Sequence, residues 1–457
     1  MGKDIAAPLI ISVSGLRGEV GRSLTPDVAM RYAIAFSLSV PEDGPFVITW
    51  DGRNSGPIFA DALCAALGAV GRRTLVGGVA ATPTTGVLVR DLNAAGGIQV
   101  SASHNPIRFN GMKLFSDEGR VIPKVAGEKV LETYRALERG TLSPPWSEPA
   151  KLGTRRAIAD TISAHLDAVL KTVDVEKIAA KKFRVLLDSN HGAGSVLGKP
   201  LLEKLGCEVV CLGDTPDGQF AHTPEPTAEN LAGILERVRA SGVDVAFCQD
   251  PDADRLAVID ADGRYLGEEY TVAICAKHKL AKKAGPVVIN CATSRMTIDV
   301  AEGFGVPAYR SAVGEANVVD RILAHGAVFG GEGNGGPIDP AVGLVRDSFV
   351  GMANILEAMA VRGLKVAQLA DELTRYAIIK EKATLPADRV VSTLDRLEEQ
   401  YRGNKTDRGD GLRVDFADRW VLVRASNTEP IVRIIAEAPD EAVAYRLCAE
   451  VRAFIGS

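Results

Sequence analysis

Residues 45–103 read PFVITWDGRNSGPIFADALCAALGAVGRRTLVGGVAATPTTGVLVRDLNAAGGIQVSAS, and this stretch decides the fold class. Its apolar runs PFVITW, RTLVGG and GGIQV have the length and composition of buried strands. Helical patterns separate them: the first places Phe59, Leu63 and Leu67 on one face, and the second begins at Thr82 with a proline behind it. Strand–helix–strand repetition predicts parallel strands joined by crossover helices.

The same alternation returns twice further along the chain. The runs FRVLLDS, CEVVCLG and VDVAFCQD are the predicted strands of a second unit, and GPVVINC, VPAYRSAV and AVFGGEG are those of a third. A hairpin with Asp262-Gly263 at its turn joins these two units. Beyond residue 372, an amphipathic helix, two strands and a closing helix predict a smaller α+β unit.

We therefore predict an α/β protein with three related α/β domains, built on mixed sheets, and a C-terminal α+β domain. A chain of 457 residues has the length for three or four domains with buried cores, at ~100–200 residues each. The predicted domains are residues 1–152, 153–256, 257–372 and 373–457.

The composition excludes several classes of protein. The net charge is −5, and no basic run is interleaved with aromatic residues, which argues against nucleic-acid binding. No apolar run reaches the roughly 18 residues of a membrane span, and the first residues lack the pattern of a signal peptide. The seven cysteines are odd in number and form no CxxC pair, as expected of reduced thiols in a cytoplasmic protein.

Four polar clusters each follow an apolar strand, where ligands collect in open α/β sheets. The first is SASHNPIRFNGMK, which contains Ser101, Ser103, His104 and Lys113. Either serine could act as a nucleophile, with the histidine or the lysine managing protons and charge. The alternative is an ordinary capped turn, because Ser-x-x-Asn-Pro is also good turn chemistry.

The second cluster, DPDADR, holds Asp250, Asp252 and Asp254 beside Arg255. In a loop these three carboxylates can converge on one hard cation. Three carboxylates suit Mg²⁺, which takes further oxygen ligands from water and phosphate. The alternative is a solvated acidic turn.

The third cluster, GGEGNGG, places Glu332 and Asn334 among five glycines. Glycines allow the backbone to approach a ligand closely, and a carboxylate and an amide can bind sugar hydroxyls. A dinucleotide fingerprint is not indicated, because Pro337 follows where that motif would open a helix. The alternative is a flexible glycine loop.

The fourth cluster, RASNTEP, offers many hydrogen-bond donors to a phosphate group. An ordinary surface turn with one salt bridge is the alternative. The candidate phosphate-binding residues are Arg424, Ser426, Asn427, Thr428 and, beyond the proline, Arg433.

With these motifs the chain resembles the α-D-phosphohexomutase family over nearly its whole length. The matching segments, in the family's order, are SGLRG, ASHNP, NGMK, PDG, EPTAENL, DPDADR, GEGNGG and RASNTEP. The resemblance implies four domains around a central cleft. It also implies an isomerase that interconverts hexose or hexosamine 6-phosphates and 1-phosphates through a phosphoserine and a 1,6-bisphosphate, which also serves as primer.

The resemblance also implies roles for individual residues. It favours Ser103 over Ser101 as the phosphorylated serine, and it assigns Mg²⁺ to the three aspartates together with a phosphoserine oxygen. Arg17, Lys113 and His104 would lie near the reacting groups, and Arg255 would neutralise developing charge. The sugar would be held by Glu332 and Asn334, and the second phosphate by Arg424, Ser426, Asn427, Thr428 and Arg433.

Two loops depart from the family pattern. Many members carry a serine and a histidine where this chain has Asn334 and Gly336, so Lys113 and His104 remain as candidate general bases. Many also carry a histidine or lysine at the position of Glu315. This carboxylate could pair with a substrate ammonium or be a solvated loop group.

The resemblance is closest to a prokaryotic phosphoglucosamine mutase-like branch, with phosphomannomutase or phosphoglucomutase activity as the second interpretation. A Mg²⁺-dependent sugar phosphatase and a non-catalytic sugar-phosphate sensor are alternatives from other classes. We expect a small sugar phosphate as partner, neither nucleic acid nor membrane, and a monomer or homodimer.

Overall fold

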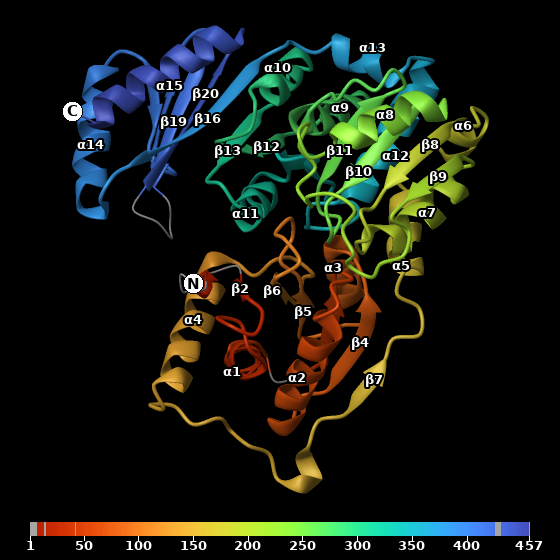
Figure 1. Cartoon of the computed structure of the whole chain (residues 1–457), viewed down its shortest axis with the longest axis vertical. Coiled ribbons are helices and arrows are strands. Elements are labelled where there is room, and N and C mark those ends of the chain that lie inside the picture. The colour runs from red at the N-terminus through yellow and green to blue at the C-terminus, as the bar shows by residue number, and fades with distance from the viewer. Residues whose placement is uncertain (1–6, 13–14, 42, 426–430, 457) are drawn as a thin grey trace, which may run out of the picture.

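A mixed seven-stranded sheet forms domain I, which lies at the bottom of Figure 1. The computed structural model describes residues 7–12, 15–41, 43–425 and 431–456. The strand order is β1-β2-β6-β5-β3-β4-β7. The elements are β1 (Ile10–Ser12), β2 (Gly15–Glu19), α1 (Pro26–Ser37), β3 (Phe46–Trp50), α2 (Gly56–Ala69), β4 (Thr74–Val79), α3 (Thr82–Asp91), β5 (Gly96–Val100), β6 (Phe109–Ser116), α4 (Lys124–Glu138) and β7 (Arg155–Ala157).

Helices cover both faces of this sheet, as the apolar strands predict. Side chains of a strand point to alternate faces. Phe46 and Ile48 of β3 accordingly share a core with α1, α2 and α4, whereas Val47 packs with Leu88 and Val89 of α3. The predicted parallel pairing holds for β3 with β4 and β5, and the later strand β6 is antiparallel to β5.

Domain II has a four-stranded sheet in the order β11-β10-β8-β9, in which only β11 is antiparallel. Val185 and Leu187 of β8 face one core, and the intervening Leu186 faces a second core with α8. The elements are α5 (Ser163–Leu170), α6 (Val175–Ala179), β8 (Arg184–Asp188), α7 (Gly194–Lys204), β9 (Glu208–Leu212), α8 (Ala232–Ser241), β10 (Val245–Gln249) and β11 (Leu256–Asp260).

Domain III repeats this plan with the strand order β13-β12-β14-β15. Its long helices α9 and α12 share one continuous apolar core with domain II, so these two domains are packed as one body. The elements are α9 (Glu268–Lys282), β12 (Val287–Asn290), α10 (Met296–Gly303), β13 (Ala308–Ser311), α11 (Glu315–His325), β14 (Phe329–Glu332), β15 (Gly336–Ile338), α12 (Ser348–Arg362) and α13 (Val366–Asp371).

Two sheets continue past the predicted domain boundaries. Strand β7 pairs with β4 of the first sheet, so domain I extends beyond residue 152. Strand β11 pairs along its length with β10, so the second sheet ends after residue 256, and the hairpin belongs to domain II. Backbone hydrogen bonds between strands far apart in sequence decide both boundaries, and local composition does not report them.

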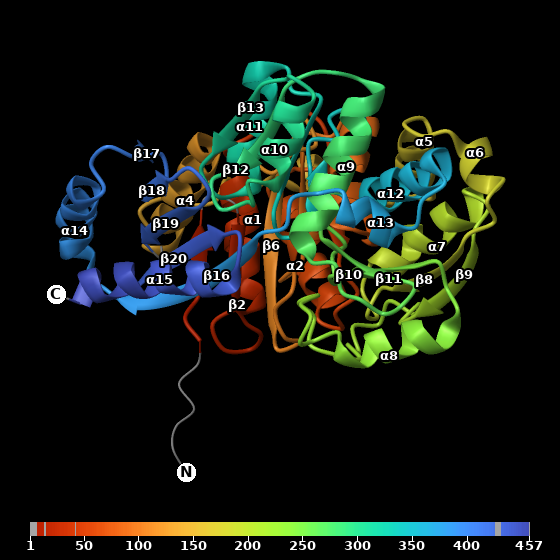
Figure 2. The ribbon, with the colours of Figure 1, turned by 90° about the horizontal axis from the view of Figure 1, so that it is seen from above.

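Domain IV is an α+β unit whose antiparallel sheet has the order β16-β20-β19-β18-β17. One sheet face packs on α14 and α15, while Trp420 and Leu422 on the other face pack against Cys291 of domain III. In the view from above, this domain lies at the opposite end of the molecule from α6 and β9 (Figure 2). The elements are β16 (Ala377–Thr384), α14 (Ala387–Gln400), β17 (Lys405–Asp407), β18 (Leu412–Asp415), β19 (Trp420–Ala425), β20 (Ile431–Ala438) and α15 (Glu441–Gly456).

The described part of the chain contains no helix with the length and apolar character needed to cross a bilayer. All seven cysteines are free thiols, and five of them are buried. The predicted functional loops begin where β5, β10, β14 and β19 end, one in each domain.

Candidate active site

Ser103 lies in the loop that follows β5, in a conformation unusual for a residue with a side chain. Its φ angle is +48°, in the left-handed region, and its side chain is almost fully buried. Its N–H donates to Oγ of Ser101 (2.9 Å), and its own Oγ donates to Oδ2 of Asp250 (3.0 Å). Strained backbone held in place by surrounding contacts is typical of functional loops. Ser101 therefore supports the loop, and Ser103 faces the aspartates.

A buried arginine outside the four sequence clusters holds this loop. Arg53 donates to the carbonyl oxygens of Ser103 (2.7 Å) and Asn105 (2.8 Å), and its Nε donates to Oδ2 of Asp51 (3.0 Å). The same Asp51 oxygen accepts from the Ser101 hydroxyl (2.7 Å). The available signal was the polar pair in DGR, directly after the apolar run PFVITW.

The three aspartates of the second cluster converge, as predicted for a metal site. One carboxylate oxygen from each of Asp250, Asp252 and Asp254 lies within 4.8 Å of the others, and all three side chains are buried. Among the described residues, Oδ1 of Asp252 and Oδ1 of Asp254 have no hydrogen-bond partner. Buried, unpaired carboxylate oxygens beside a serine hydroxyl fit Mg²⁺, so these residues form a suitable site for it.

Lys113 partly neutralises this cluster. Its Nζ donates to Oδ2 of Asp252 (2.5 Å) and to Oδ2 of Asp254 (2.7 Å). Burial alone would lower the pKa of Lys113, but the two carboxylates outweigh it and raise that pKa above its ordinary value. Burial, with the charges of its two neighbours, raises the pKa of Asp250 well above the usual range.

The two predicted general bases differ in their surroundings. Lys113 is held as an ammonium ion, which has no lone pair to accept a proton. Burial, with Arg255 and Arg17 nearby, lowers the pKa of His104 to about 3, so its imidazole is neutral at pH 7. Nδ1 of His104 lies 3.3 Å from Oγ of Ser103. Of the two, only His104 is neutral, and one of its two ring nitrogens therefore has a lone pair that can accept a proton.

Arg346, which belongs to none of the four sequence clusters, joins the metal loop to the sugar loop. This buried guanidinium donates to Oδ2 of Asp254 (2.6 Å), Oε2 of Glu332 (2.8 Å) and Oε2 of Glu315 (3.0 Å). Five fixed donors let one arginine bridge several carboxylates. A single arginine in the loop before α12 carries no recognisable pattern, so only the tertiary structure reveals it.

The predicted sugar-binding residues lie beside Arg346. Glu332 ends β14 and also accepts from Nδ2 of Asn290 (2.7 Å) and from the N–H of Gly314 (3.0 Å). With its amide oriented to satisfy both groups, Asn334 accepts from Nη1 of Arg346 (2.8 Å). These contacts fix both side chains at the end of the strand, within the same polar network as the aspartates.

The structure explains the glycine at position 336. A Cβ at Gly336 would lie 2.4 Å from Cδ of Arg346, so any side chain there would displace the arginine. In this chain, Arg346 therefore occupies the space that a side chain at position 336, a histidine in many relatives, would need. The two departures from the family pattern, at 336 and 315, meet at the same guanidinium.

Glu315 is not a solvated loop carboxylate, which corrects one of the two interpretations from the sequence. It is the first residue of α11, is buried, and pairs with Arg346. Burial raises its pKa to about 7, although Arg346 opposes this shift. Its other oxygen, Oε1, has no hydrogen-bond partner among the described residues.

Two further predicted arginines border the serine loop. Nη1 of Arg17, in β2, donates to Oδ1 of Asn105 (2.9 Å). Arg255 lies 3.9 Å from both Asp250 and Asp254, and its Nη1 reaches Oε1 of Glu225 (3.4 Å). Both guanidinium groups therefore stand next to the serine and the aspartates, in position to offset negative charge.

The predicted phosphate-binding loop belongs to domain IV. Ser426, Asn427 and Thr428 lie outside the described residues. Arg424 and Arg433 are paired across neighbouring strands β19 and β20, and Nε of Arg424 lies 3.1 Å from Oδ2 of Asp410. Among the described residues these two arginines are not in contact with the serine or the aspartates.

Four protein-family models match successive parts of this chain. They are described as phosphoglucomutase/phosphomannomutase alpha/beta/alpha domains I, II and III and the C-terminal domain. They cover residues 9–140, 163–263, 268–376 and 366–454. The chain belongs to the α-D-phosphohexomutase family. It is therefore an isomerase, a phosphohexomutase whose serine and aspartates lie at the ends of two strands in different domains.

Individual members of the family align over nearly the full length. A phosphoglucomutase/phosphomannomutase of Thermococcus kodakarensis is 37% identical, with 93% of this chain and 94% of the relative covered. A probable phosphoglucosamine mutase of Methanothermobacter thermautotrophicus is 30% identical, with 98% of each covered. The crystal structure of a putative phosphomannomutase from Thermus thermophilus superposes with a TM-score of 0.82 at 25% identity, covering 99% of this chain and 100% of that one.

Proposed function

We propose that this phosphohexomutase interconverts the 6-phosphate and 1-phosphate of glucosamine through phosphorylated Ser103. The observation that carries the proposal is the contact between Oγ of Ser103 and Oδ2 of Asp250, beside two aspartates that each have one oxygen without a hydrogen-bond partner. A phosphoserine here would carry roughly −1.5 to −2 charges, which need a cation close by. Asp250, Asp252 and Asp254 would hold Mg²⁺, which supplies charge stabilisation during phosphoryl transfer.

Side chains of the protein would accept the proton and offset the negative charge during the transfer. His104 is our candidate for accepting the proton of the attacking sugar hydroxyl, since its Nδ1 lies 3.3 Å from Ser103 Oγ. Arg17, Arg255 and the Lys113 ammonium would offset charge on the transferring group. A 1,6-bisphosphate formed in this way must turn around before it returns a phosphoryl group to the serine.

A reversible transfer needs a second anchor for the phosphate that is not reacting. Arg424, Ser426, Asn427, Thr428 and Arg433 are our candidates for it, and Glu332 and Asn334 are those for the sugar hydroxyls. Arg424 and Arg433 lie on adjacent strands, so two guanidinium groups are available to one phosphate. Since the described part of domain IV packs on domain III through loops and one sheet face, we propose that it moves toward domain I when substrate binds.

Two observations favour different sugars. The buried Oε1 of Glu315 has no partner among the described residues, and an ammonium at C2 of glucosamine would satisfy it better than a hydroxyl group. The 37% identical relative named phosphoglucomutase/phosphomannomutase instead supports glucose or mannose phosphates, which we retain as the second candidate. The substitution Glu315→Gln should reduce kcat/KM for glucosamine 6-phosphate selectively if the first proposal is right.

The test is mutase turnover on glucosamine, mannose and glucose 6-phosphates, measured side by side with Mg²⁺ and the matching 1,6-bisphosphate as primer. We expect the highest kcat/KM with glucosamine 6-phosphate and no turnover by Ser103→Ala on any substrate. Preference for another sugar would retain the mechanism and reject the substrate. Free phosphate released faster than isomerised product would indicate a phosphatase, and turnover by Ser103→Ala would reject the phosphoserine.

The turnover assay does not address the oligomeric state or the location of the enzyme in the cell. We expect a monomer or a homodimer, which light scattering after size exclusion would distinguish. We also expect the enzyme in the cytoplasm, where sugar phosphates are available, and fractionation of the source cells would show it.

A further inference from the structure

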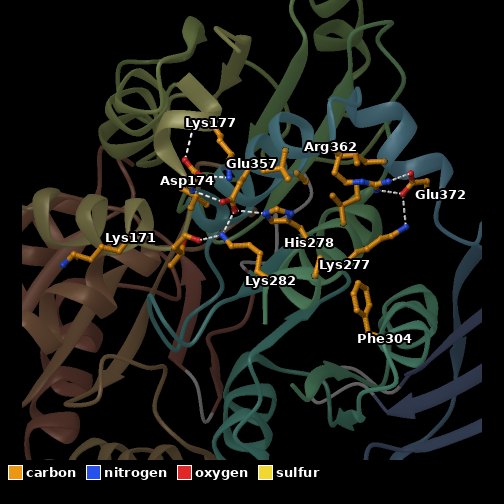
Figure 3. Close-up of a pocket in the computed structure, with 17 residues that line it drawn as sticks. Lys171, Asp174, Lys177, Lys277, His278, Lys282, Phe304, Glu357, Arg362 and Glu372 are labelled. Carbon is orange, nitrogen blue, oxygen red and sulfur yellow. Dashed lines mark hydrogen bonds and ion pairs between the residues drawn. The ribbon is translucent and has the colours of Figure 1, made fainter. Parts of the chain in front are cut away.

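A cavity of about 850 Å³ lies between domains II and III (Figure 3), and its lining does not include Asp250, Asp252 or Asp254. Its walls come from the last turns of α9 and α12, from α13, from the segment before α6, and from Phe304. Helix α9 begins beside the sugar loop, where the Glu269 carboxylate lies against Gly333. At about 1.5 Å per residue, the lining residues of α9, from Ile274 to Lys282, lie roughly 8–20 Å along the helix from that point. The cavity is thus a separate site.

Apolar side chains line the middle of this cavity. Ile274, Ala281 and Leu369 contribute from α9 and α13. Two larger side chains remain open to solvent: Phe304 is 40% exposed and Val361 is 53% exposed. Burying such surface under an apolar ligand is favourable by about 25 cal/mol per Å². This lining therefore favours a ligand with an apolar or aromatic body over a sugar or a free inorganic ion.

Charged groups flank the apolar lining at two ends, as Figure 3 shows. At one end, Glu357 accepts from Nε2 of His278 and from Nζ of Lys282, both at 2.6 Å. At the other end, Glu372 accepts from Arg362 (2.7 Å) and Lys277 (2.9 Å). Each carboxylate is thus already shared by two cationic or hydrogen-bonding groups and cannot also bind an added cation well.

The lining as a whole carries more positive than negative groups. Five lysine and arginine side chains face three carboxylates, a surplus of two positive charges, on a chain of net charge −5. Lys171 lies at one edge of the cavity (Figure 3), and its side chain makes no hydrogen bond or ion pair with the described residues, so its charge is uncompensated there. The cationic lining residues are Lys171, Lys177, Lys277, Lys282 and Arg362, and the carboxylates are Asp174, Glu357 and Glu372.

We propose that this cavity binds an organic anion with an apolar or aromatic body. The apolar middle takes the body, and the surplus cations take its acidic group. The volume lies within the ordinary range of small-molecule sites, roughly 300–1,000 Å³. The cavity is distinct from the phosphohexomutase site, and the proposal does not rest on the sugar that this site uses.

The test uses 8-anilino-1-naphthalenesulfonate, an aromatic sulfonate whose fluorescence rises on binding, with the full-length protein. We expect saturable binding at one class of site. Val361→Glu places a carboxylate at the exposed edge of the cavity and should weaken binding by at least about tenfold, through like-charge repulsion. Val391→Glu is the matched control, because Val391 is a 65% exposed helical valine outside the cavity.

A second pair of variants tests the charge separately. Lys171→Glu should weaken binding severalfold, whereas Lys199→Glu, on the exposed face of α7, should not. Circular dichroism and melting curves check that all four variants fold. Equal affinity of Val361→Glu and Val391→Glu, or of the two lysine variants, would overturn the proposal.

Competition experiments test whether the aromatic body and the acidic group of the ligand are both required for binding. Naphthalene-1-sulfonate should displace the dye, whereas 1-naphthol, which lacks the acidic group, and sulfate, which lacks the aromatic body, should not at the same concentration. If either of these displaced the dye as well as naphthalene-1-sulfonate did, the required chemistry would be wrong and the proposal would fail.

Discussion

Replacing Arg346 tests whether the metal loop and the sugar loop depend on one buried guanidinium. Arg346→Met keeps most of the side-chain volume but removes three charge-assisted hydrogen bonds, to Asp254, Glu315 and Glu332. The three carboxylates are at most 7% exposed, so water does not replace the lost donors. Of these three carboxylates, only Asp254 would keep a cationic partner, which is Lys113. Arg346→Lys retains the charge but not the planar set of donors that reaches three acceptors.

The magnitude follows from the burial. Breaking a buried ion pair by removing one partner costs about 3–5 kcal/mol, because the remaining charge is left uncompensated. At about 2–4 °C per kcal/mol for a unit of this size, Arg346→Met should melt roughly 6–20 °C below the wild type. Misplacing Asp254 and Glu332 by about 1 Å should lower kcat/KM about 10²-fold. For Arg346→Lys, the loss of one charge-assisted hydrogen bond, about 1.5–3 kcal/mol, predicts an intermediate effect.

The assay combines melting curves with mutase kinetics on the preferred sugar phosphate. Arg402→Met is the control, because Arg402 is 78% exposed in its pair with Glu399 and should change neither quantity measurably. The graded order of wild type, lysine variant and methionine variant would separate lost charge from lost geometry. A methionine variant that melts within about 2 °C of the wild type and keeps kcat/KM within about threefold would refute the reasoning.

Three further outcomes are expected. Gly336→Ala should lose about 1–3 kcal/mol of stability, because its Cβ would lie 2.4 Å from Cδ of Arg346. Gly343→Ala, whose Cβ would have no atom within 4 Å, is the control and should melt like the wild type. Equal melting temperatures of the two variants would contradict the packing described at Gly336. Mg²⁺ at about 100 times its Kd should stabilise the protein by about 2.7 kcal/mol, and EDTA should reverse this stabilisation and abolish turnover. If Mg²⁺ stabilised Asp252→Asn by a similar amount, the metal would bind elsewhere. Burial raises the pKa of Glu269 to about 8, so its carboxyl keeps a proton in the folded state that the unfolded chain releases near its ordinary pKa, and stability should fall as pH rises toward 8. Glu269→Gln should remove at most about 2–3 kcal/mol of that fall between pH 6 and 8, and melting curves with unchanged pH dependence would exclude this carboxyl as their source.

Much of the site was accessible from the sequence because its residues are close neighbours along the chain. The aspartates alternate within five residues after a strand, and alternation in a loop places carboxylates together. The serine loop follows another apolar strand in the same way. The order of the motifs along the chain identified the family, and four consecutive domain profiles confirmed it. The roles of the individual residues stay predictions until the variants are measured.

The domain boundaries were less accessible. The strand at residues 155–157 is short, exposed and arginine-rich, with no apolar pattern, yet its backbone completes the edge of the first sheet. Its hydrogen bonds join main-chain groups, which every sequence supplies. The hairpin after Asp254 was recognised as a hairpin, but which sheet it extends depends on pairing with β10.

By itself, the sequence determined the fold class, the four units and the clusters of chemistry at strand ends, because periodic apolar patterns and short motifs are local. Only the tertiary structure decided which distant groups meet. Arg53 reaches a loop 50 residues away, and Arg346 reaches an aspartate 92 residues away; neither contact has a sequence signature. The tertiary structure also showed that Gly336 leaves room for Arg346 and that Glu315 is buried beside it. The physical reason is that burial and pairing set the charge of such groups, and both depend on chain segments that come together only when the protein folds.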